Sequence, residues 1–244
     1  MAEMTAQWMT AGFVHGVLNT DNINITGESF DYGPWRFLPS FNPSFTAAYF
    51  DHSGLYAYGR QPEAMMWNVA RLGECLIALS TLEKIQSIFD DFWKRYERFL
   101  DISVLCRLGL KEISRKSSTI LRTDLFSFME ESQIGFEFLF FDWYGGAQSQ
   151  KRALSGLRSD FYAQDGFRTL RDGIMQHEPA PGIDLSHPYF RGETPHMMPV
   201  ETVEALWQPI ATADDWSGLH DAMRQIASMK SALVPPSPPD VATP

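Results

Sequence analysis

The sequence predicts a mainly α-helical protein with one small β-hairpin. Apolar residues recur at helical spacing over two long stretches, 62–79 and 82–99, and this spacing predicts two core helices. An alternating stretch over residues 23–26 is followed by Gly27, which indicates a short strand and a tight turn. Of the 244 residues, 44% are hydrophobic and 14% are aromatic, so the chain has enough apolar surface for a sizeable core.

The first two predicted helices lie on either side of a long loop. Residues 3–14 form the first helix, with Met4 and Trp8 on its apolar side. Pro62 suits the first turn of the second helix. The apolar positions of that helix are Met65, Val69, Leu72, Leu76 and Leu79. Cys75 falls within this apolar pattern, so we expect a buried thiol there.

The next helices are predicted from their capping residues. Ser80 and Glu83 form a capping box at the start of the third helix. Its apolar stripe consists of Ile85, Phe89, Phe92, Tyr96 and Phe99. Thr123 or Asp124 can cap a further helix. Residues 136–141 form a buried element whose type the pattern leaves open.

Two helices are predicted near the C-terminal end. One covers residues 200–207, and the other runs from Thr212 to about Leu233, with Thr212 and Asp215 as a variant of the capping box. The segment from Pro235 onward is rich in proline and is predicted to be disordered.

We predict three parts in the chain. The first is a lobe over residues 1–146, and the second is a helical extension over residues 147–234. The third is a Pro-rich disordered tail over residues 235–244.

Charge and composition exclude several classes of partner. The formal net charge is −10 at pH 7, which argues against nucleic acid or an anionic membrane as a main partner. The two cysteines support neither a disulfide framework nor a metal site. We find no signal peptide and no apolar run near the ~20 residues that span a bilayer, so we expect a cytoplasmic protein.

One segment, residues 15–34, contains the residues with the clearest chemistry. Asp21 and Asn22 precede the predicted hairpin, and Asp31 follows it in Asp31-Tyr32-Gly33. Such a hairpin would bring Asn22 and Asp31 together at its open end. An amide oxygen beside a carboxylate suits Mg²⁺ that carries the phosphates of a nucleotide. An isolated Asp-Asn pair could equally cap a turn and satisfy backbone groups.

Protein kinases arrange the same residue types in this order. In kinases an Asn ends the catalytic loop, and an Asp-x-Gly sequence follows a short hairpin. The catalytic Asp of the kinase loop is replaced here by Val17, which cannot accept a proton. The nearby carboxylate is that of Asp21, directly before Asn22.

The motifs resemble those of the selenoprotein O (SelO) family, which consists of kinase-fold proteins that act as protein adenylyltransferases. The resemblance rests on 15–22 (HGVLNTDN) and 31–34 (DYGP). Further matching blocks are Phe37-Leu38, Asp51 with Gly54, Tyr56-Ala57-Tyr58, Gln61-Pro62 and Trp67-Asn68. The strong similarity covers roughly residues 5–80, and several blocks in the correct order make it specific.

The resemblance implies a reaction and a role for each site residue. Such an enzyme transfers AMP from ATP to Ser, Thr or Tyr hydroxyls of protein substrates and releases pyrophosphate. Asp21 would be the catalytic proton acceptor, and Asn22 and Asp31 would bind Mg²⁺ or Mn²⁺. Asp31 would also face the phosphates of ATP. The lobe of residues 1–146 would then be a kinase-like catalytic lobe.

A kinase-like enzyme also needs a smaller N-terminal lobe that grips ATP with a Gly-rich loop, a Lys and a Glu. We find none of these before His15, so we expect a kinase C-lobe that lacks the N-terminal lobe and is incomplete or inactive alone. A separate N-lobe chain is one possible partner. The alternative is a non-catalytic helical remnant, or one half of a split enzyme acting as a binding module. A small-molecule kinase of the aminoglycoside phosphotransferase type ranks last, because Val17 replaces the Asp it needs.

Overall fold

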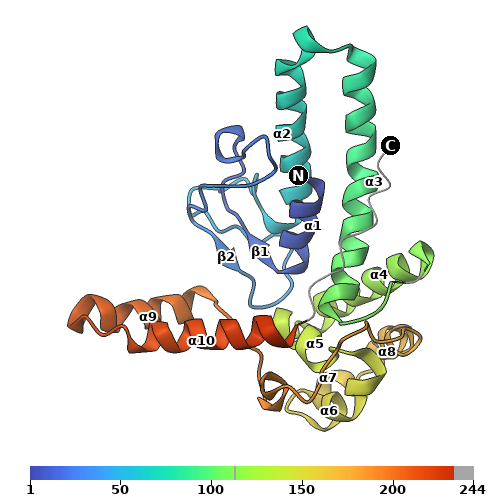
Figure 1. Cartoon of the computed structure of the whole chain (residues 1–244), viewed down its shortest axis with the longest axis vertical. Helices are drawn as coiled ribbons and strands as arrows, with labels where there is room; N and C mark the ends of the chain where they lie inside the picture. Colours follow the sequence, from blue (N-terminus) through green and yellow to red (C-terminus); the bar gives the residue numbers. More distant parts are fainter. Residues whose placement is uncertain (113, 234–244) are drawn as a thin grey trace.

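The computed structural model describes residues 1–112 and 114–233 (Figure 1). It is mainly helical with one small antiparallel sheet, as predicted. The α-helices are α1 (Ala2–Thr10), α2 (Gln61–Cys75), α3 (Leu82–Arg107), α4 (Arg115–Ser132), α5 (Phe136–Asp142), α6 (Gln150–Ser155), α7 (Ser159–Tyr162), α8 (Phe167–Met175), α9 (Val200–Ala213) and α10 (Ser217–Ala232). The strands are β1 (Phe13–Val14) and β2 (Arg36–Phe37). The 3₁₀ helices are η1 (Thr20–Asn22), η2 (Tyr58–Arg60), η3 (Ile77–Leu79), η4 (Gly146–Ser149) and η5 (Pro188–Arg191).

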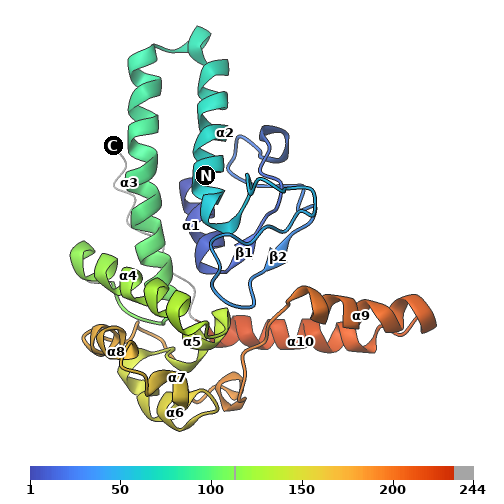
Figure 2. The ribbon, with the colours of Figure 1, turned by 180° about the vertical axis from the view of Figure 1, so that it is seen from behind.

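Helices α2 and α3 form a long antiparallel hairpin, and α1 lies against its lower half (Figures 1 and 2). Gly73 allows the two long helices to approach closely. A Cβ atom at this position would lie 2.5 Å from the Phe89 ring and 3.0 Å from Ile85. Helices α4 to α8 pack below the hairpin, whereas α9 and α10 form a second hairpin that projects sideways (Figure 1).

One hydrophobic core joins α1 to α8. It extends in sequence from Ala2 to Ile174, and its largest fully buried side chains include Trp143, Tyr58 and Phe136. A smaller cluster of Phe141, Tyr144, Phe190 and Ala232 connects the end of α10 to α5 and η5. The core contains residues from both sides of position 146, and the three-part division of the chain stays a prediction.

The predicted hairpin is smaller than its sequence pattern suggests. Ile23 and Ser29 form a single antiparallel bridge around the turn at Gly27, whereas the regular ladder pairs Phe13 with Phe37 outside it. Ile25 is 80% exposed, so the alternating stretch has no apolar surface on which to extend a strand.

The first predicted helix ends earlier than expected. It stops at Thr10, because Gly12 adopts a left-handed conformation with φ of +62°. A Cβ atom at Gly12 would also lie 2.9 Å from the ring of Phe136, so the close packing favours glycine. Residues 13 and 14 then form β1 instead of continuing the helix.

Several predicted helix starts were displaced. The α3 cap is Thr81, which accepts a hydrogen bond from the Lys84 amide, and not Ser80. The α4 helix begins at the cap Ser114, well before Thr123 and Asp124. Thr212 lies inside α9, where its hydroxyl bonds to the Gln208 carbonyl.

Two further expectations concern the ends of elements. Cys75 is exposed and not buried, because the end of α2 lies at the tip of the α2–α3 hairpin, beyond the core (Figure 1).

The predicted disordered tail, residues 235–244, lies outside the described residues. Within the described ranges, no helix is both long enough and apolar enough to cross a bilayer.

Candidate functional site

The predicted site residues lie on the loop that connects β1 to β2. Asp21 and Asn22 belong to η1, directly before the Ile23–Ser29 bridge, and Asp31 follows on the other arm of that bridge. The β1–β2 pair holds both ends of the loop, and the inner bridge brings its two arms together. The structure therefore places the three predicted residues on one short hairpin-like loop.

The side chain of Asn22 is half-buried and fixed in orientation. Its amide nitrogen Nδ2 donates a hydrogen bond of 3.0 Å to the Val17 carbonyl. The amide oxygen has no protein partner among the described residues, and it is therefore available as a ligand atom. Val17 has a structural role here through its backbone, in the position where a kinase has its catalytic Asp.

Both carboxylates are exposed, and each leaves an oxygen free. Asp31 accepts one hydrogen bond of 3.0 Å, from the amide of Gly33, through Oδ1. Its second oxygen and the Asp21 carboxylate have no hydrogen-bond partner within residues 1–112 and 114–233. Asp21 also acts electrostatically on Tyr56, whose pKa is raised by burial and by the charges of Asp51 and Asp21.

These oxygen atoms fit a metal that keeps part of its coordination shell for other ligands. The described residues contain no cluster of three or more His, Cys, Asp or Glu side chains that could hold an ion by themselves. Mg²⁺ commonly takes only one or two protein ligands and completes its shell with waters and phosphate oxygens. The amide oxygen of Asn22 and the free oxygen of Asp31 match that requirement in number and in chemistry.

His15 is the first residue of this loop and is fully buried. Its ring contacts the rings of Trp8 and Tyr32, with centroid distances of 5.4 and 5.6 Å. Nε2 lies 2.7 Å from the Ser29 hydroxyl, and Nδ1 accepts a hydrogen bond of 3.3 Å from the Val17 amide. Burial lowers the pKa of His15, and the nearby charge of Asp31 opposes this shift only in part.

Two polar residues of α2 hold the start of the loop in place. Gln61 accepts from the His15 amide and donates to the Phe13 carbonyl, both at 2.9 Å. About two turns further along the same face of the helix, Asn68 donates a hydrogen bond of 2.9 Å to the Leu18 carbonyl. Both residues belong to the matching sequence blocks Gln61-Pro62 and Trp67-Asn68, but those blocks assign no role to either of them. The available signal was a pair of polar residues on the apolar side of a core helix.

A second loop, residues 42–58, packs directly against the first. A Cβ atom at Gly16 would lie 2.9 Å from Pro34 and 3.1 Å from Ala47, so the two loops meet there without space for a side chain. The Tyr56 hydroxyl donates a hydrogen bond to the side-chain oxygen of Asn19, next to η1. The second loop therefore helps to fix the position of η1, which contains Asp21.

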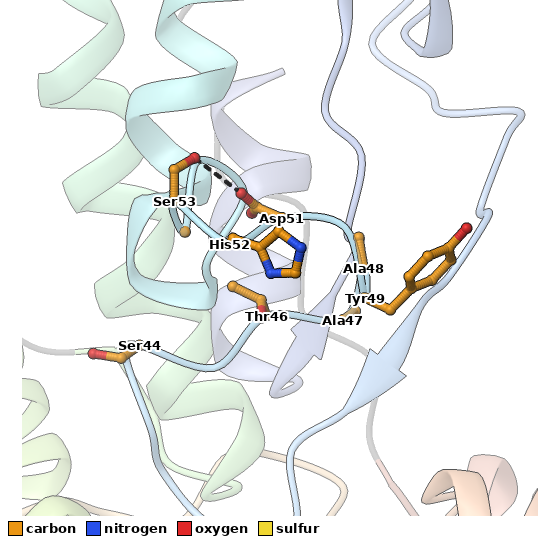
Figure 3. Close-up of a pocket in the computed structure, with 9 residues that line it drawn as sticks. Ser44, Thr46, Ala47, Ala48, Tyr49, Asp51, His52 and Ser53 are labelled. Carbon is orange, nitrogen blue, oxygen red and sulfur yellow. Dashed lines mark hydrogen bonds between the residues drawn. The ribbon is translucent and has the colours of Figure 1, made fainter.

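Asp51 organises the second loop and lines an open pocket of about 450 Å³ (Figure 3). Its carboxylate accepts hydrogen bonds from the amides of Leu55 and Tyr56, both at 2.8 Å, and from the Ser53 hydroxyl at 3.3 Å. Partial burial opposes ionisation, but these donors outweigh it and lower the pKa of Asp51. His52 lies beside Asp51 in the same pocket (Figure 3).

Comparison with known proteins identifies the family. A family model described as "Protein adenylyltransferase SelO" matches residues 1–227, which is nearly the whole described chain. The chain belongs to the SelO family. The resemblance expected from the sequence motifs is thus confirmed, and it extends well beyond residue 80.

The similar proteins include two relatives named "Protein nucleotidyltransferase YdiU". The one from Trichodesmium erythraeum is 35% identical over 93% of this chain, and the one from Trichormus variabilis is 33% identical over 93%. In both cases the alignment covers 49% of the relative. This SelO-family chain therefore spans about half the length of these relatives.

Proposed function

We propose that this chain supplies the metal- and phosphate-binding part of a protein adenylyltransferase that uses ATP. The observation that carries the proposal is the pair of free oxygen atoms, on Asn22 and Asp31, held on one anchored loop. Asn22 and Asp31 would bind Mg²⁺ or Mn²⁺, with Asp31 also facing the ATP phosphates. When bound, the metal would neutralise charge on the phosphate oxygens during the transfer.

In the proposed reaction, a Ser, Thr or Tyr hydroxyl oxygen of a protein substrate attacks the α-phosphorus of ATP. A new oxygen–phosphorus bond forms, the bond from the α-phosphorus to the bridging oxygen breaks, and pyrophosphate leaves. The hydroxyl proton passes to Asp21, which is exposed and free to accept it. The role of Asp21 as proton acceptor derives from the family resemblance, and its lack of a competing partner among the described residues supports it.

The proposal treats the described region as the equivalent of a kinase C-lobe. A complete ATP site also requires the groups that grip the nucleotide from the other side. We propose that these come from sequence outside this segment, either in a longer chain or in a separate N-lobe chain. The fact that this segment covers about half of its relatives supports this view. A cytoplasmic location stays a prediction.

The first experiment determines the intact mass of the protein from its own cells and then assays that protein with ATP labelled at the α-phosphate. We expect label on protein hydroxyls in the presence of Mg²⁺ or Mn²⁺, and we expect Asp31→Ala to abolish it. Glu28→Ala is the matched control, because Glu28 is an exposed acid on the turn of the same loop. Full activity in Asp31→Ala would contradict the proposal.

The position of the label separates the proposal from kinase chemistry. Adenylyl transfer moves the α-phosphate to the acceptor, whereas a kinase moves the γ-phosphate. Transfer of label only from γ-labelled ATP would favour the small-molecule kinase interpretation.

A second candidate function is that of a binding module, such as one half of a split enzyme. Large apolar side chains are exposed at the tip of the α2–α3 hairpin, and these are Leu76, Ile77, Leu79 and Leu82. If the isolated chain transfers no AMP but gains activity when mixed with a separate N-lobe chain, the split enzyme is supported. Leu79→Asp should then weaken that complex, because Leu79 is 82% exposed and its substitution leaves the core intact.

A further inference from the structure

A closed ring of hydrogen bonds surrounds the backbone and side chain of Asn22. The side-chain nitrogen Nδ2 of Asn22 donates to the Val17 carbonyl at 3.0 Å, and the backbone amide of Val17 donates to His15 Nδ1 at 3.3 Å. His15 Nε2 lies 2.7 Å from the Ser29 hydroxyl, which in turn donates to the Asn22 carbonyl at 3.0 Å. The ring thus returns to the residue from which it started.

The chemistry of the partners allows only one arrangement of protons. The Val17 amide can only donate, so Nδ1 of His15 must be the unprotonated nitrogen. The Ser29 hydroxyl uses its single proton toward the Asn22 carbonyl, which can only accept. Nε2 of His15 must therefore carry the proton and donate it to Ser29. His15 is thus neutral and in the Nε2–H tautomer.

The ring joins the two arms of the loop that carry the proposed metal ligands. Ser29 belongs to the arm that leads to Asp31, and it pairs with Ile23, the neighbour of Asn22. Ser29 is 8% exposed and His15 is 0% exposed, so water competes little for these hydrogen bonds. Both the backbone and the side chain of Asn22 are held by partners that the ring connects.

We infer that Ser29 and His15 are positioning residues that keep the Asn22 amide oxygen in the orientation needed to bind a metal ion. The inference rests on the proposed function, because it assumes that Asn22 is a metal ligand. Groups that orient a ligand from behind typically change metal affinity by about 10–100-fold when they are removed. A serine that served packing alone would change stability and leave metal affinity as it was.

The first test examines the ring in the wild-type protein and needs no variant. Nitrogen-15 NMR of the imidazole distinguishes a protonated from an unprotonated ring nitrogen. We expect His15 at neutral pH to show a protonated Nε2 and an unprotonated Nδ1. A protonated Nδ1 would overturn the inference, since the Val17 amide could then no longer donate to it.

The second test measures binding of Mn²⁺, with and without ATP, from the EPR signal of the free ion. Ser29→Ala should weaken Mn²⁺ binding about tenfold, and Ser29→Thr should restore most of the affinity because it keeps the hydroxyl. Thr26→Ala is the matched control, since Thr26 carries an exposed hydroxyl on the same turn and should leave the affinity unchanged. Circular dichroism confirms that each variant is folded.

Asn22→Ala separates the failure of this inference from failure of the proposed site. If Asn22→Ala weakens Mn²⁺ binding but Ser29→Ala does not, the positioning role is wrong and the metal site stands. If Asn22→Ala binds Mn²⁺ as the wild type does, or the wild type binds none, the proposed metal site is wrong and the inference falls with it.

Discussion

At the scale of single residues, two buried histidines connect the protein's stability to pH. Burial lowers the pKa of His15, with Asp31 opposing the shift, and burial also lowers the pKa of His177, with a backbone hydrogen bond involving Lys111 opposing it. As the pH falls, these two histidines therefore bind protons in the unfolded chain before they do so in the folded protein. Their contribution to stability is complete above the unfolded pKa of about 6.5 and is lost as the pH falls below it.

We therefore expect the free energy of unfolding to decrease between pH 7.5 and pH 5.5. Each histidine contributes a slope of at most about 1.4 kcal/mol per pH unit, since each takes up one proton on unfolding. Urea unfolding at several pH values measures this slope, and His15→Gln or His177→Gln should each reduce it. His52→Gln is the control, because His52 is exposed on a loop. An unchanged slope in both buried variants would contradict the explanation.

At the scale of the elements, α2 is the support of the candidate site. The first residue of the helix, Gln61, bonds to the backbone of Phe13 and His15, and Asn68 bonds to the backbone of Leu18. These bonds fix the chain from the end of β1 to the start of η1. The helix therefore sets the position of the segment that leads to Asp21 and Asn22, without contributing a proposed ligand itself.

The importance of this support can be measured with Gln61→Met, which keeps the length of the side chain but loses both hydrogen bonds. The buried His15 amide and the partly buried Phe13 carbonyl would then lack partners, so we expect a loss of about 2 kcal/mol in the free energy of unfolding. Gln86→Met is the control, because Gln86 bonds to Asp90 on the exposed surface of α3 and should change stability by less than about 0.5 kcal/mol. Equal stability of the two variants in chemical denaturation would contradict the proposed support.

At the scale of the whole molecule, a buried ion pair joins parts of the chain that are distant in sequence. Arg158 donates two hydrogen bonds of 2.6 Å to Asp142 at the end of α5, and it also donates to the Glu193 carbonyl at 2.7 Å. The Tyr162 hydroxyl donates to the same carboxylate at 2.7 Å. The cluster connects α5, α7 and the segment before α9, on both sides of position 146.

Asp142→Ala should lower the free energy of unfolding by about 3–5 kcal/mol, because it leaves a buried guanidinium without its counter-charge. Asp165→Ala is the matched control. Asp165 pairs with Arg168 at 2.8 Å on the surface, where its side chain is 94% exposed, and such pairs contribute about 0–1 kcal/mol. Thermal and chemical denaturation of both variants compare the two ion pairs. A similar loss in both would mean that the buried pair has no special role.

The exposed apolar tip of the α2–α3 hairpin belongs to the same scale. The tip lies far from helices α4 to α8 (Figure 1), and Ile77 and Leu79 are 51% and 82% exposed there. Local sequence patterns predicted that both helices exist, but α2 ends at Cys75 and not at Leu79, and α3 continues to Arg107. The patterns could not indicate where the core ends along the hairpin. This explains why Cys75, which fits the apolar pattern, is exposed.

The sequence by itself determined the helical class and the family, and it predicted the residues of the candidate site. Helical periodicity predicted α2 and α3, because it depends only on residues three and four positions apart. The motif around Asp21, Asn22 and Asp31 was equally local, since these residues lie on one short loop. Features that depend on residues close together in the sequence could therefore be predicted from the sequence alone.

Only the tertiary structure decided what holds that loop in place. Gln61 and Asn68 bond to backbone atoms of residues that precede them by more than forty positions. Such bonds produce no sequence pattern, because nearly every residue has the same backbone groups. Ser29 gained its role from contact with buried His15. Helix α1 ends at Thr10, shortly before Gly12, whose left-handed conformation and close contact with Phe136 favour glycine. Such contacts exist only once distant segments have packed together, which is why local patterns predicted the chemical groups of the site but not their support.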